Sequence, residues 1–274
     1  MTSTQAAHNM QQVINKIVCS ECLTAMREYI PADSIDLTVT SPPYDSLRKY
    51  GGCDFDLEGI AAELYRITKP GGVVVWVVND ATENGSETGT SFRHALAIKE
   101  AGFRLHDTMI FAKNNPMPRS DRRYYQAFEY MFVFSKGTPK TFNALTEPCK
   151  YAGYPTSPTA WDKDGQLQHV RRRIIKDEKK RSNIFYYTVG NNNRSAKNTA
   201  HPAVFPEQLA ADHITTWSNE GDIVLDIFGG SGTTAKMAAL SGRRFIHFDI
   251  SSDYCAHAAA RVQEALQQQE REQL

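Results

Sequence analysis

The chain alternates between short, strongly apolar runs and longer segments whose apolar residues recur at helical spacing. Residues 35–40 form a β-branched run that stops at two prolines, as a strand does at residues that cannot continue a ladder. Residues 57–68 have the periodicity of an amphipathic helix, which we expect to close at the Lys-Pro-Gly-Gly sequence of residues 69–72. Residues 73–78 are apolar without interruption, which is typical of a strand covered on both faces.

The same alternation continues along most of the chain. The pattern predicts a helix at residues 92–101, strands at 105–112 and 130–134, a helix at 206–217, a strand at 223–227, a helix at 233–240, a strand at 245–250 and a last helix at 253–268. Strands that alternate with helices in this way predict an α/β fold built on a parallel, doubly wound sheet.

The segment between residues 137 and 200 interrupts this pattern. It is rich in Asn, Tyr, Thr, Pro and basic residues and has little sustained periodicity. We therefore expect an insertion at one end of the sheet, covering residues 137–200. Residues 1–136 and 201–274 would together form the catalytic domain.

Composition and charge narrow the class of protein. With 41% hydrophobic and 23% charged residues among 274, the chain has the make-up of a globular protein. It contains no apolar run of membrane-spanning length and no signal-peptide pattern, and its five cysteines fit a reducing compartment, so we expect a cytoplasmic location. Charge is unevenly spread: residues 111–200 hold 17 Lys and Arg against 7 Asp and Glu, and the remainder holds 14 against 24. One basic region in a neutral chain suits a polyanion, although a solvated polar insertion gives the same pattern.

A glycine-rich sequence follows the strand predicted at residues 223–227. It reads Asp226-Ile227-Phe228-Gly229-Gly230-Ser231-Gly232-Thr233-Thr234 and leads into a helix, an arrangement that lets the backbone approach a nucleotide-like ligand closely. A phosphate-binding P-loop would require Lys after Gly232, where Thr233 stands. A nicotinamide-binding turn fits the Gly-x-Gly-x-x-Ala spacing, and the whole string also fits an S-adenosylmethionine loop. Asp249, at the end of the next strand, lies about where a ribose-binding acid belongs.

The second candidate sequence is Thr40-Ser41-Pro42-Pro43-Tyr44, at the end of the strand predicted at residues 35–40. An exocyclic amine on a base is a poor nucleophile because its lone pair is delocalised into the ring. Acceptors on its hydrogens, such as Ser41 Oγ and the Pro42 carbonyl, would aim that lone pair at a methyl donor, and proline offers no competing N–H. Tyr44 can stack on an extruded base. Taken alone, the same residues also suit a plain strand-ending turn.

Together these sequences resemble the beta class of DNA amino-methyltransferases, in which the catalytic motif precedes the cofactor motif. Residues 67–72, 113–118, 128–136 and 201–206 are similar to further segments of that family in the same order. The resemblance implies a Rossmann-like methyltransferase sheet, S-adenosyl-L-methionine as cofactor and a target-recognition role for residues 137–200. It assigns catalysis to Ser41, Pro42, Pro43 and Tyr44. It assigns cofactor binding to Asp226, Phe228, Gly230, Gly232, Thr233, Thr234, Asp249, His201, Pro202, Phe205 and Glu21.

Two positions depart from the family pattern. Ser20-Glu21 stands where Gly-Asp is usual, and Asp249 is one methylene shorter than the usual ribose-binding Glu. Ser41, where other members have Asp, favours N4 of cytosine as the target, with N6 of adenine as the alternative. A DNA-binding module with a vestigial cofactor site and a nicotinamide oxidoreductase are further alternatives.

Two cysteine sequences are weaker candidates. Pro148-Cys149 resembles the nucleophile sequence of enzymes that methylate a ring carbon, but its context differs. Cys19-x-x-Cys22 lacks the second ligand pair that a zinc site needs, so we expect no metal and instead two half-buried thiols at a strand end.

Double-stranded DNA is the expected partner, and a cognate restriction endonuclease and a homodimer are left open. Basic residues interleaved with aromatic ones suit phosphate contacts and base stacking, although an exposed loop charged for solubility would look alike. The candidates for DNA contact are Arg119, Arg122, Arg123, Arg171, Arg172, Arg173, Lys179, Lys180 and Arg181.

Overall fold

The computed structural model describes residues 3–43, 56–116, 122–190 and 206–273. Two compact units make up the chain: a larger one of residues 1–143 and 183–274, and a smaller one of residues 144–182. The smaller unit falls within the range that the sequence sets apart from the alternating pattern.

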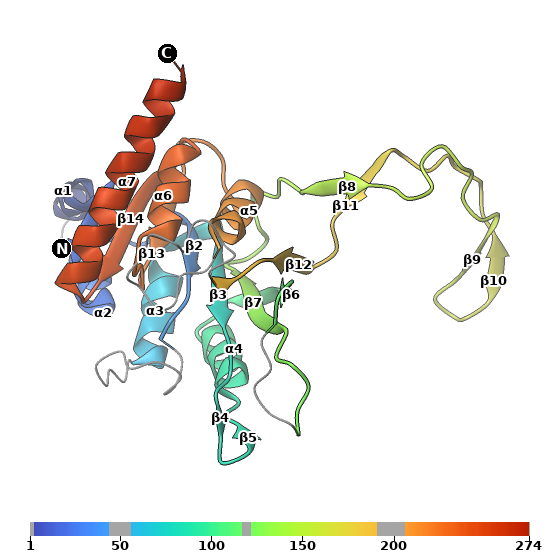
Figure 1. Ribbon diagram of the computed structural model, residues 1–274, viewed down its shortest axis with the longest axis horizontal. Helices are drawn as coiled ribbons and strands as arrows, with labels where there is room; N and C mark the ends of the chain where they lie inside the picture. The colour runs from blue at the N-terminus through green and yellow to red at the C-terminus, as the bar shows by residue number, and fades with distance from the viewer. Residues whose placement is uncertain (1–2, 44–55, 117–121, 191–205, 274) are drawn as a thin grey trace. The chain divides into compact units, whose positions relative to one another are not determined.

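Eight strands within the described part of the larger unit form one sheet in the order β1-β14-β13-β2-β3-β7-β6-β12 (Figure 1). Their bounds are β1 (Lys16–Cys19), β2 (Ile35–Thr40), β3 (Thr68–Val78), β6 (Arg104–Lys113), β7 (Phe128–Ser135), β12 (Ile184–Tyr187), β13 (Ile223–Asp226) and β14 (Arg244–Asp249). Neighbouring strands run parallel except that β7 runs antiparallel to both β3 and β6. The predicted doubly wound sheet is confirmed, but the expectation that it is wholly parallel is wrong. Consecutive strands β6 and β7 pair directly, and direct pairing of neighbours in the chain favours the antiparallel sense.

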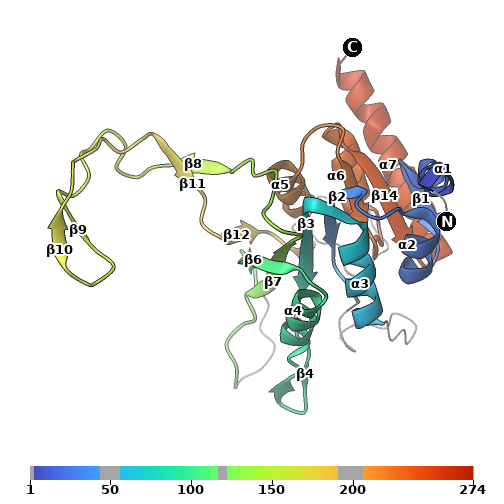
Figure 2. The ribbon, with the colours of Figure 1, turned by 180° about the vertical axis from the view of Figure 1, so that it is seen from behind.

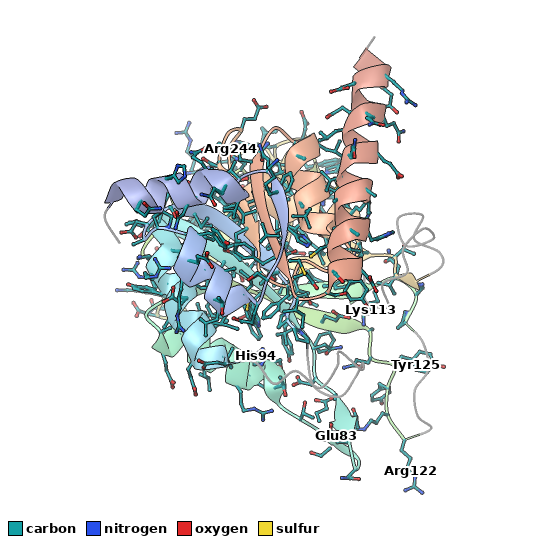
Figure 3. All side chains as sticks on the ribbon, turned by 90° about the vertical axis from the view of Figure 1, so that its left-hand side faces the viewer. Glu83, His94, Lys113, Arg122, Tyr125 and Arg244 are labelled. Atoms are coloured by element: carbon teal, nitrogen blue, oxygen red, sulfur yellow. The ribbon has the colours of Figure 1, made fainter. Side chains whose placement is uncertain are left out.

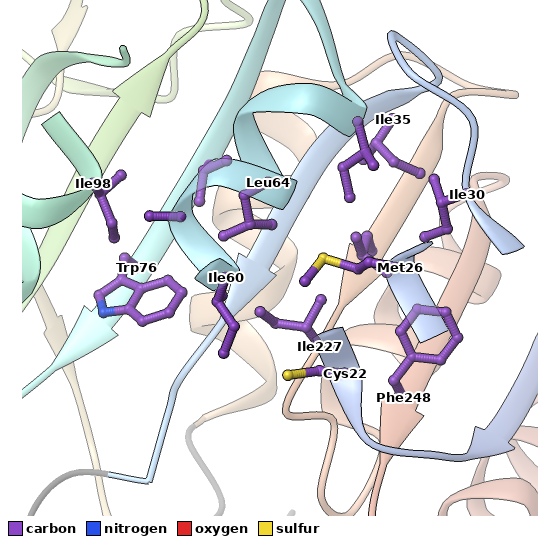
Figure 4. Packing of buried hydrophobic residues seen from close by; sticks show 14 of the residues in the cluster. Cys22, Met26, Ile30, Ile35, Ile60, Leu64, Trp76, Ile98, Ile227 and Phe248 are labelled. Atoms are coloured by element: carbon purple, nitrogen blue, oxygen red, sulfur yellow. The ribbon is translucent and has the colours of Figure 1, made fainter. Parts of the chain in front are cut away.

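Helices cover both faces of this sheet, as Figures 1 and 2 show. The helices are α1 (Ser3–Val13), α2 (Cys22–Tyr29), α3 (Leu57–Ile67) and α4 (Thr90–Glu100) on one face, and α5 (Glu207–Trp217), α6 (Thr233–Leu240) and α7 (Ser252–Gln273) on the other. Along β3, Val74, Trp76 and Val78 belong to the first core cluster, and the valines that alternate with them belong to the second. Figure 4 shows Trp76 beside Ile60 in the first cluster. Because successive side chains of a strand point to opposite faces and both faces are buried here, every residue of the run must be apolar.

The end of α3 differs from the sequence prediction. Residues 69–72 were expected to close the helix, but β3 begins at Thr68, which pairs with Ile35 before the register shifts. Gly71 has a φ of 84°, a conformation that other residues rarely adopt, so the chain can bend there without leaving the strand. The Thr68 backbone N–H bonds the Leu64 carbonyl and ends the helix one residue earlier than predicted.

A short hairpin follows the carboxyl end of β3. It consists of β4 (Thr82–Glu83) and β5 (Ser86–Glu87) and leads into α4. Asp80, which is buried, accepts hydrogen bonds from the backbone N–H of Ser91 at 2.9 Å and from its hydroxyl at 2.5 Å. These bonds satisfy donors at the start of α4 and fix the hairpin on the core.

The smaller unit contains only short strands in its described residues. They are β8 (Thr146–Pro148), β9 (Thr159–Trp161), β10 (Leu167–His169) and β11 (Glu178–Lys180), which form the two-stranded sheets β8–β11 and β9–β10. β12 lies inside the predicted insertion range of 137–200 but belongs to the larger sheet, where it pairs with β6. No helix within the described ranges is long and apolar enough to cross a membrane.

Candidate cofactor and catalytic site

Four parallel strands of the larger unit, β1, β14, β13 and β2, end at one edge of the sheet. Predicted site residues close or follow each of them: Glu21 after β1, Asp249 in β14, Asp226 in β13 and Ser41 after β2. From the centre of the sheet, β13 connects through α6 to β14 on one side, and β2 connects through α3 to β3 on the other. Open α/β sheets bind ligands where such connections diverge. The carboxyl ends of β13 and β2 are therefore the candidate site.

The glycine-rich sequence forms a tight loop between β13 and α6. Gly230 and Gly232 have φ values of 49° and 77°, and Gly232 forms the left-handed N-cap of α6. The backbone N–H of Gly230 donates to Asp249 Oδ2 at 2.8 Å. A Cβ atom at Gly229 would lie 2.1 Å from the buried His247 ring, so a side chain there would require the ring to move. The conformation of the loop thus depends on its glycines. The loop leads directly into the N-terminus of α6, whose first N–H groups can bind an anionic group.

Asp226 is the most deeply buried carboxyl group of the site. Its Oδ1 accepts a hydrogen bond from Thr40 Oγ1 at 2.7 Å and one from the Phe228 backbone N–H at 3.2 Å. Complete burial raises the pKa of Asp226 to about 6, and the nearby carboxylate of Asp249 adds to the rise while the hydrogen bonds oppose it. No ion pair joins Asp226 to a Lys or Arg in the described residues. A positively charged ligand would relieve the cost of its ionised form.

The predicted catalytic segment lies next to this carboxyl group. Ser41 and Pro43 are half-buried and Pro42 is buried, directly after Thr40 at the end of β2. Thr234 Oγ1, in the first turn of α6, donates to the Val39 carbonyl at 3.2 Å. Two hydrogen bonds, from Thr40 and Thr234, therefore join the strand that carries Ser41 to the glycine loop and its helix. The structure brings together two sequences that lie 186 residues apart.

The two predicted acids at the neighbouring strands already have backbone partners. Asp249 accepts from the N–H groups of Gly230 and Ser251, both at 2.8 Å. Glu21 is the N-cap of α2 and accepts from Leu23 and Thr24, each at 2.8 Å. Partial burial acts to raise the pKa of Glu21, but these backbone donors hold it below its usual value. Both acids therefore have a structural role in holding these backbone segments. Each also has lone pairs to spare, so a contact with ribose or adenine stays a prediction.

The other predicted cofactor residues lie in the loop and the first turn of α6. Phe228 is half-buried, with its ring edge-on to Trp76 at a centroid distance of 6.1 Å. The Thr233 hydroxyl accepts from Arg261 at 3.0 Å, and the Thr234 hydroxyl is bonded to Val39. Each hydroxyl keeps unused hydrogen-bonding capacity, so a contact with a cofactor stays a prediction for these two residues as well. Tyr44, His201, Pro202 and Phe205 lie outside the described residues.

Cys19 and Cys22 differ from the expectation of two half-buried thiols. Cys19 is exposed, whereas Cys22 is buried in the first turn of α2 with Sγ 3.3 Å from Glu21 Oε1. Burial raises the pKa of the Cys22 thiol well above its usual value, with the Glu21 carboxylate adding to the rise. A thiol that stays protonated is a poor metal ligand or nucleophile.

Comparison with known proteins agrees with this geometry. The family described as DNA methylase matches residues 35–260, from β2 into the first half of α7. The orphan methyltransferase M.BamHII of Bacillus amyloliquefaciens is 53% identical over 243 residues, covering 86% of this chain and 92% of its own length. The chain belongs to the DNA methylase family. It is an amino-methyltransferase of the N4/N6 type, and S-adenosylmethionine is the cofactor of this class.

More distant relatives share the fold over most of their length. M.SmaI of Serratia marcescens is 25% identical over 291 residues and covers 90% of each chain. The solved PvuII DNA methyltransferase, described as cytosine-N4-specific, has a TM-score of 0.63 at 23% identity and covers 88% of this chain and 84% of its own. The M1.HpyAVI–SAM complex has a TM-score of 0.58 at 23% identity, covering 90% and 98%. The predicted beta-class methyltransferase fold is confirmed.

The predicted DNA-contacting residues of this methyltransferase fall in both units. Arg122 and Arg123 lie in the larger unit, in the loop before β7, where Figure 3 shows Arg122 and Tyr125 projecting from the same end as Glu83. Arg123 donates to the Gly85 carbonyl and pairs with Glu87 at 3.7 Å, so it also holds the β4–β5 hairpin. Arg119 lies outside the described residues.

The remaining basic candidates belong to the smaller unit and are exposed: Arg171, Arg172, Arg173, Lys179, Lys180 and Arg181. Lys179 pairs with Glu147 at 3.0 Å across the β8–β11 sheet. An exposed pair of this kind contributes little stability, so it leaves the lysine available to a phosphate.

Sequence reasoning missed three residues that shape the site. Thr40 lies within the motif but has no role in the sequence prediction, although it links the predicted catalytic segment to Asp226. Glu207 and Arg261 form an ion pair at 2.5 Å behind the glycine loop. The motif position could have indicated Thr40. No local pattern connects Glu207 with Arg261, because they are 54 residues apart.

Proposed function

We propose that this methyltransferase transfers a methyl group from S-adenosyl-L-methionine to the exocyclic N4 of cytosine in double-stranded DNA. The observation that carries the proposal is the 2.7 Å hydrogen bond between Thr40 and Asp226. It fixes the Ser41–Pro43 segment beside the loop that would hold the methyl donor. Donor and acceptor groups held in one geometry react as if at very high local concentration.

The residues present fit the proposed cofactor. When bound, S-adenosylmethionine supplies an electrophilic methyl group on a positively charged sulfur. Asp226, buried and without a cationic partner in the described residues, suits a ligand that carries positive charge. Gly230 and Gly232 permit close approach of the backbone, and the first N–H groups of α6 suit the ligand's carboxylate. Asp249 and Glu21 would take the ribose and adenine, and His201, Pro202 and Phe205 would close over them.

The chain's own residues would prepare the base. Ser41 Oγ and the Pro42 carbonyl would accept hydrogen bonds from the two hydrogens of the amine, which draws the nitrogen toward a tetrahedral shape. Pro42 and Pro43 have no N–H to compete for the lone pair. Tyr44 would stack on the extruded base. These interactions strengthen as the amine becomes tetrahedral, so they lower the barrier rather than simply tighten binding.

The proposed target base rests on the first residue of the Ser41–Pro43 segment. Ser41, in place of Asp, supports cytosine N4, and the PvuII enzyme that shares the fold is described as cytosine-N4-specific. Adenine N6 is the second candidate because its amine presents the same two hydrogens. Membership of the methylase family favours a methyltransferase over a nicotinamide oxidoreductase or a module with a vestigial site.

DNA would be held by the basic residues of both units. Arg122, Arg123 and Arg119 would contact phosphates near the catalytic edge. The exposed residues 171–173 and 179–181 would do so from the segment 137–200, the proposed target-recognition region. Such contacts position a protein on DNA but do not themselves read sequence.

Nucleoside mass spectrometry tests this function directly. DNA would be treated with the enzyme and an isotopically labelled methyl donor, then digested to nucleosides. The expected product is labelled N4-methyl-2′-deoxycytidine. Labelled N6-methyl-2′-deoxyadenosine would establish the second candidate, and a product labelled on neither base would contradict the proposal.

A further inference from the structure

Arg261, on α7, reaches the back of the glycine loop. Its Nη1 donates to the Ser231 carbonyl at 3.0 Å, to Ser231 Oγ at 3.1 Å and to Thr233 Oγ1 at 3.0 Å. The Arg261 side chain is 11% exposed, so these bonds form away from bulk water. One guanidinium nitrogen therefore binds both the last turn of the loop and the first residue of α6.

The other side of the same guanidinium binds α5. Nη2 of Arg261 lies 2.5 Å from Glu207 Oε1, and Lys236 Nζ, on α6, lies 2.7 Å from the same oxygen. Partial burial acts to raise the pKa of Glu207, but the two cations hold it below its usual value. Glu207 is the first residue of α5 and directly follows residues 201–206. The ionised cluster thus connects three helices to the loop.

A second contact shows that α7 packs tightly on the loop. A Cβ atom at Gly232 would lie 2.8 Å from Ala258 Cβ, one turn before Arg261 on the same helix. Ala258 is completely buried. The loop is therefore packed against α7 at Gly232 and bonded to it at Ser231 and Thr233.

Stability alone gives a poor account of this cluster. Removing charged groups from water costs free energy, and their mutual attraction often does not offset that cost. Apolar residues of similar size commonly hold helices together equally well. What a guanidinium adds is a rigid fork with fixed donor directions. Here the fork spans the distance between a carboxylate on α5 and the loop.

We propose that Arg261, Glu207 and Lys236 are positioning residues for the cofactor. Arg261 holds Ser231 and Thr233 so that the backbone of residues 229–232 keeps its binding conformation. Glu207 ties the start of α5 to that same loop through Arg261. The inference rests on the proposed assignment of the glycine loop to the cofactor.

Binding of S-adenosylhomocysteine by isothermal titration calorimetry tests the proposal on the full chain. Arg261→Met should raise the dissociation constant at least about tenfold, because hydrogen bonds to a charged group are lost. Arg261→Lys, which keeps the charge but cannot span both partners, should fall between Arg261→Met and wild type. The KM for the methyl donor should rise similarly, with kcat at saturating donor close to wild type.

Arg243→Met is the matched control. Arg243 is also a half-buried arginine that bonds backbone carbonyls, at Ser218 and Ser241, but it precedes β14 at the opposite edge of the sheet. Its loss should lower Tm and leave the dissociation constant within about twofold. If Arg261→Met lowers Tm as Arg243→Met does and binds the ligand as wild type does, the positioning role is wrong.

A third variant separates this inference from the assignment on which it rests. Gly230→Val puts a side chain into the loop itself, at a φ of 49°. If Gly230→Val and Arg261→Met both leave affinity unchanged, the glycine loop is not the cofactor site. Weakened binding in Gly230→Val with unchanged binding in Arg261→Met overturns the positioning role alone. If Arg261→Met does not fold, Arg261→Lys decides by the same comparison.

Discussion

The two units of this methyltransferase differ in how their strands are supported. In the larger unit, Val73 to Val78 of β3 are at most 1% exposed, because helices cover both faces of the sheet. In the smaller unit, most residues of β8 to β11 are exposed, and the strands pair in twos. Trp76 is fully buried in the larger unit, whereas Trp161 in the smaller unit is 73% exposed. The same residue type serves a core in one unit and a surface in the other.

This difference shows which unit has a packed core, and it supports the recognition role proposed for the smaller unit. Two-stranded sheets are marginal in water, and the smaller unit has no layer to bury its aromatic side chains. It instead presents Tyr151, Tyr154 and Trp161 to solvent, with nine Lys and Arg against five Asp and Glu in residues 144–182. Exposed aromatic rings add nothing to a hydrophobic core, but among basic side chains they suit stacking on the bases of a nucleic acid. In the larger unit, the packed sheet holds the strand ends at which we propose that the chemistry takes place.

Removing the smaller unit is the strongest way to break this comparison. The Arg181 backbone N–H bonds the Leu145 carbonyl at 3.0 Å, so the two ends of the unit lie together and a short Gly-Ser linker can replace residues 145–181. We expect S-adenosylhomocysteine binding to stay within about threefold and site-specific methylation to fall at least about a thousandfold, since target recognition is lost. A shortened chain that cannot fold would show that the larger unit is not self-sufficient.

Two tryptophan substitutions sharpen the comparison. Trp76→Ala should lower the free energy of unfolding by about 3–5 kcal/mol, because it opens a cavity in a packed core. Trp161→Ala should change it by no more than about 0.5 kcal/mol and should weaken DNA binding instead. Urea denaturation and DNA titration measure the two quantities. Equal losses of stability would mean that Trp161 is part of a core.

Asp226 gives the larger unit a specific pH dependence. Its folded-state pKa of about 6 lies above the ordinary value of 3.8, so the stability it contributes is present below pH 3.8 and lost as pH rises through 6. Asp226→Asn keeps an acceptor for Thr40 and cannot ionise. Its stability relative to wild type should rise by up to about 3 kcal/mol between pH 4 and pH 8. Urea denaturation across that range would contradict the account if the difference stayed constant.

The smallest expected effect concerns the exposed arginines of the smaller unit. Replacing Arg171, Arg172 and Arg173 with Ala should weaken DNA binding and reduce the slope of log K against log salt by up to about three, since each phosphate contact releases about one counterion. Cofactor affinity should not change. A salt slope equal to that of wild type would place these side chains on a merely solvated surface.

Most of the larger unit could be predicted from the sequence because burial on two faces leaves a local pattern. The β2 and α6 bounds follow the predicted ranges, and β13 differs by one residue. The direction of β7 could not be predicted, since an apolar run does not specify whether its neighbour is parallel. β12 was missed because it lies in an irregular segment and pairs with β6 alone at the end of the sheet.

The candidate site was predictable to the extent that function imposes a sequence motif. Asp226, the glycines and Ser41 could be predicted as site residues because ligand approach and amine chemistry would restrict those positions. Arg261, Glu207 and Lys236 were not found, because long flexible side chains on three helices can meet without any fixed spacing. The bond from Thr40 to Asp226 required the order of the strands, which places β2 beside β13.

The central claim is that Ser41, held beside the cofactor loop, acts on the amine of the base. Single-turnover methylation by Ser41→Ala tests it most directly, with Ser20→Ala, a serine after β1 at the same edge, as control. We predict that Ser41→Ala loses about 2–4 kcal/mol of transition-state stabilisation while the dissociation constants for DNA and S-adenosylhomocysteine stay near wild type, and that Ser20→Ala transfers at the normal rate. Transfer by Ser41→Ala at the wild-type rate would contradict the claim.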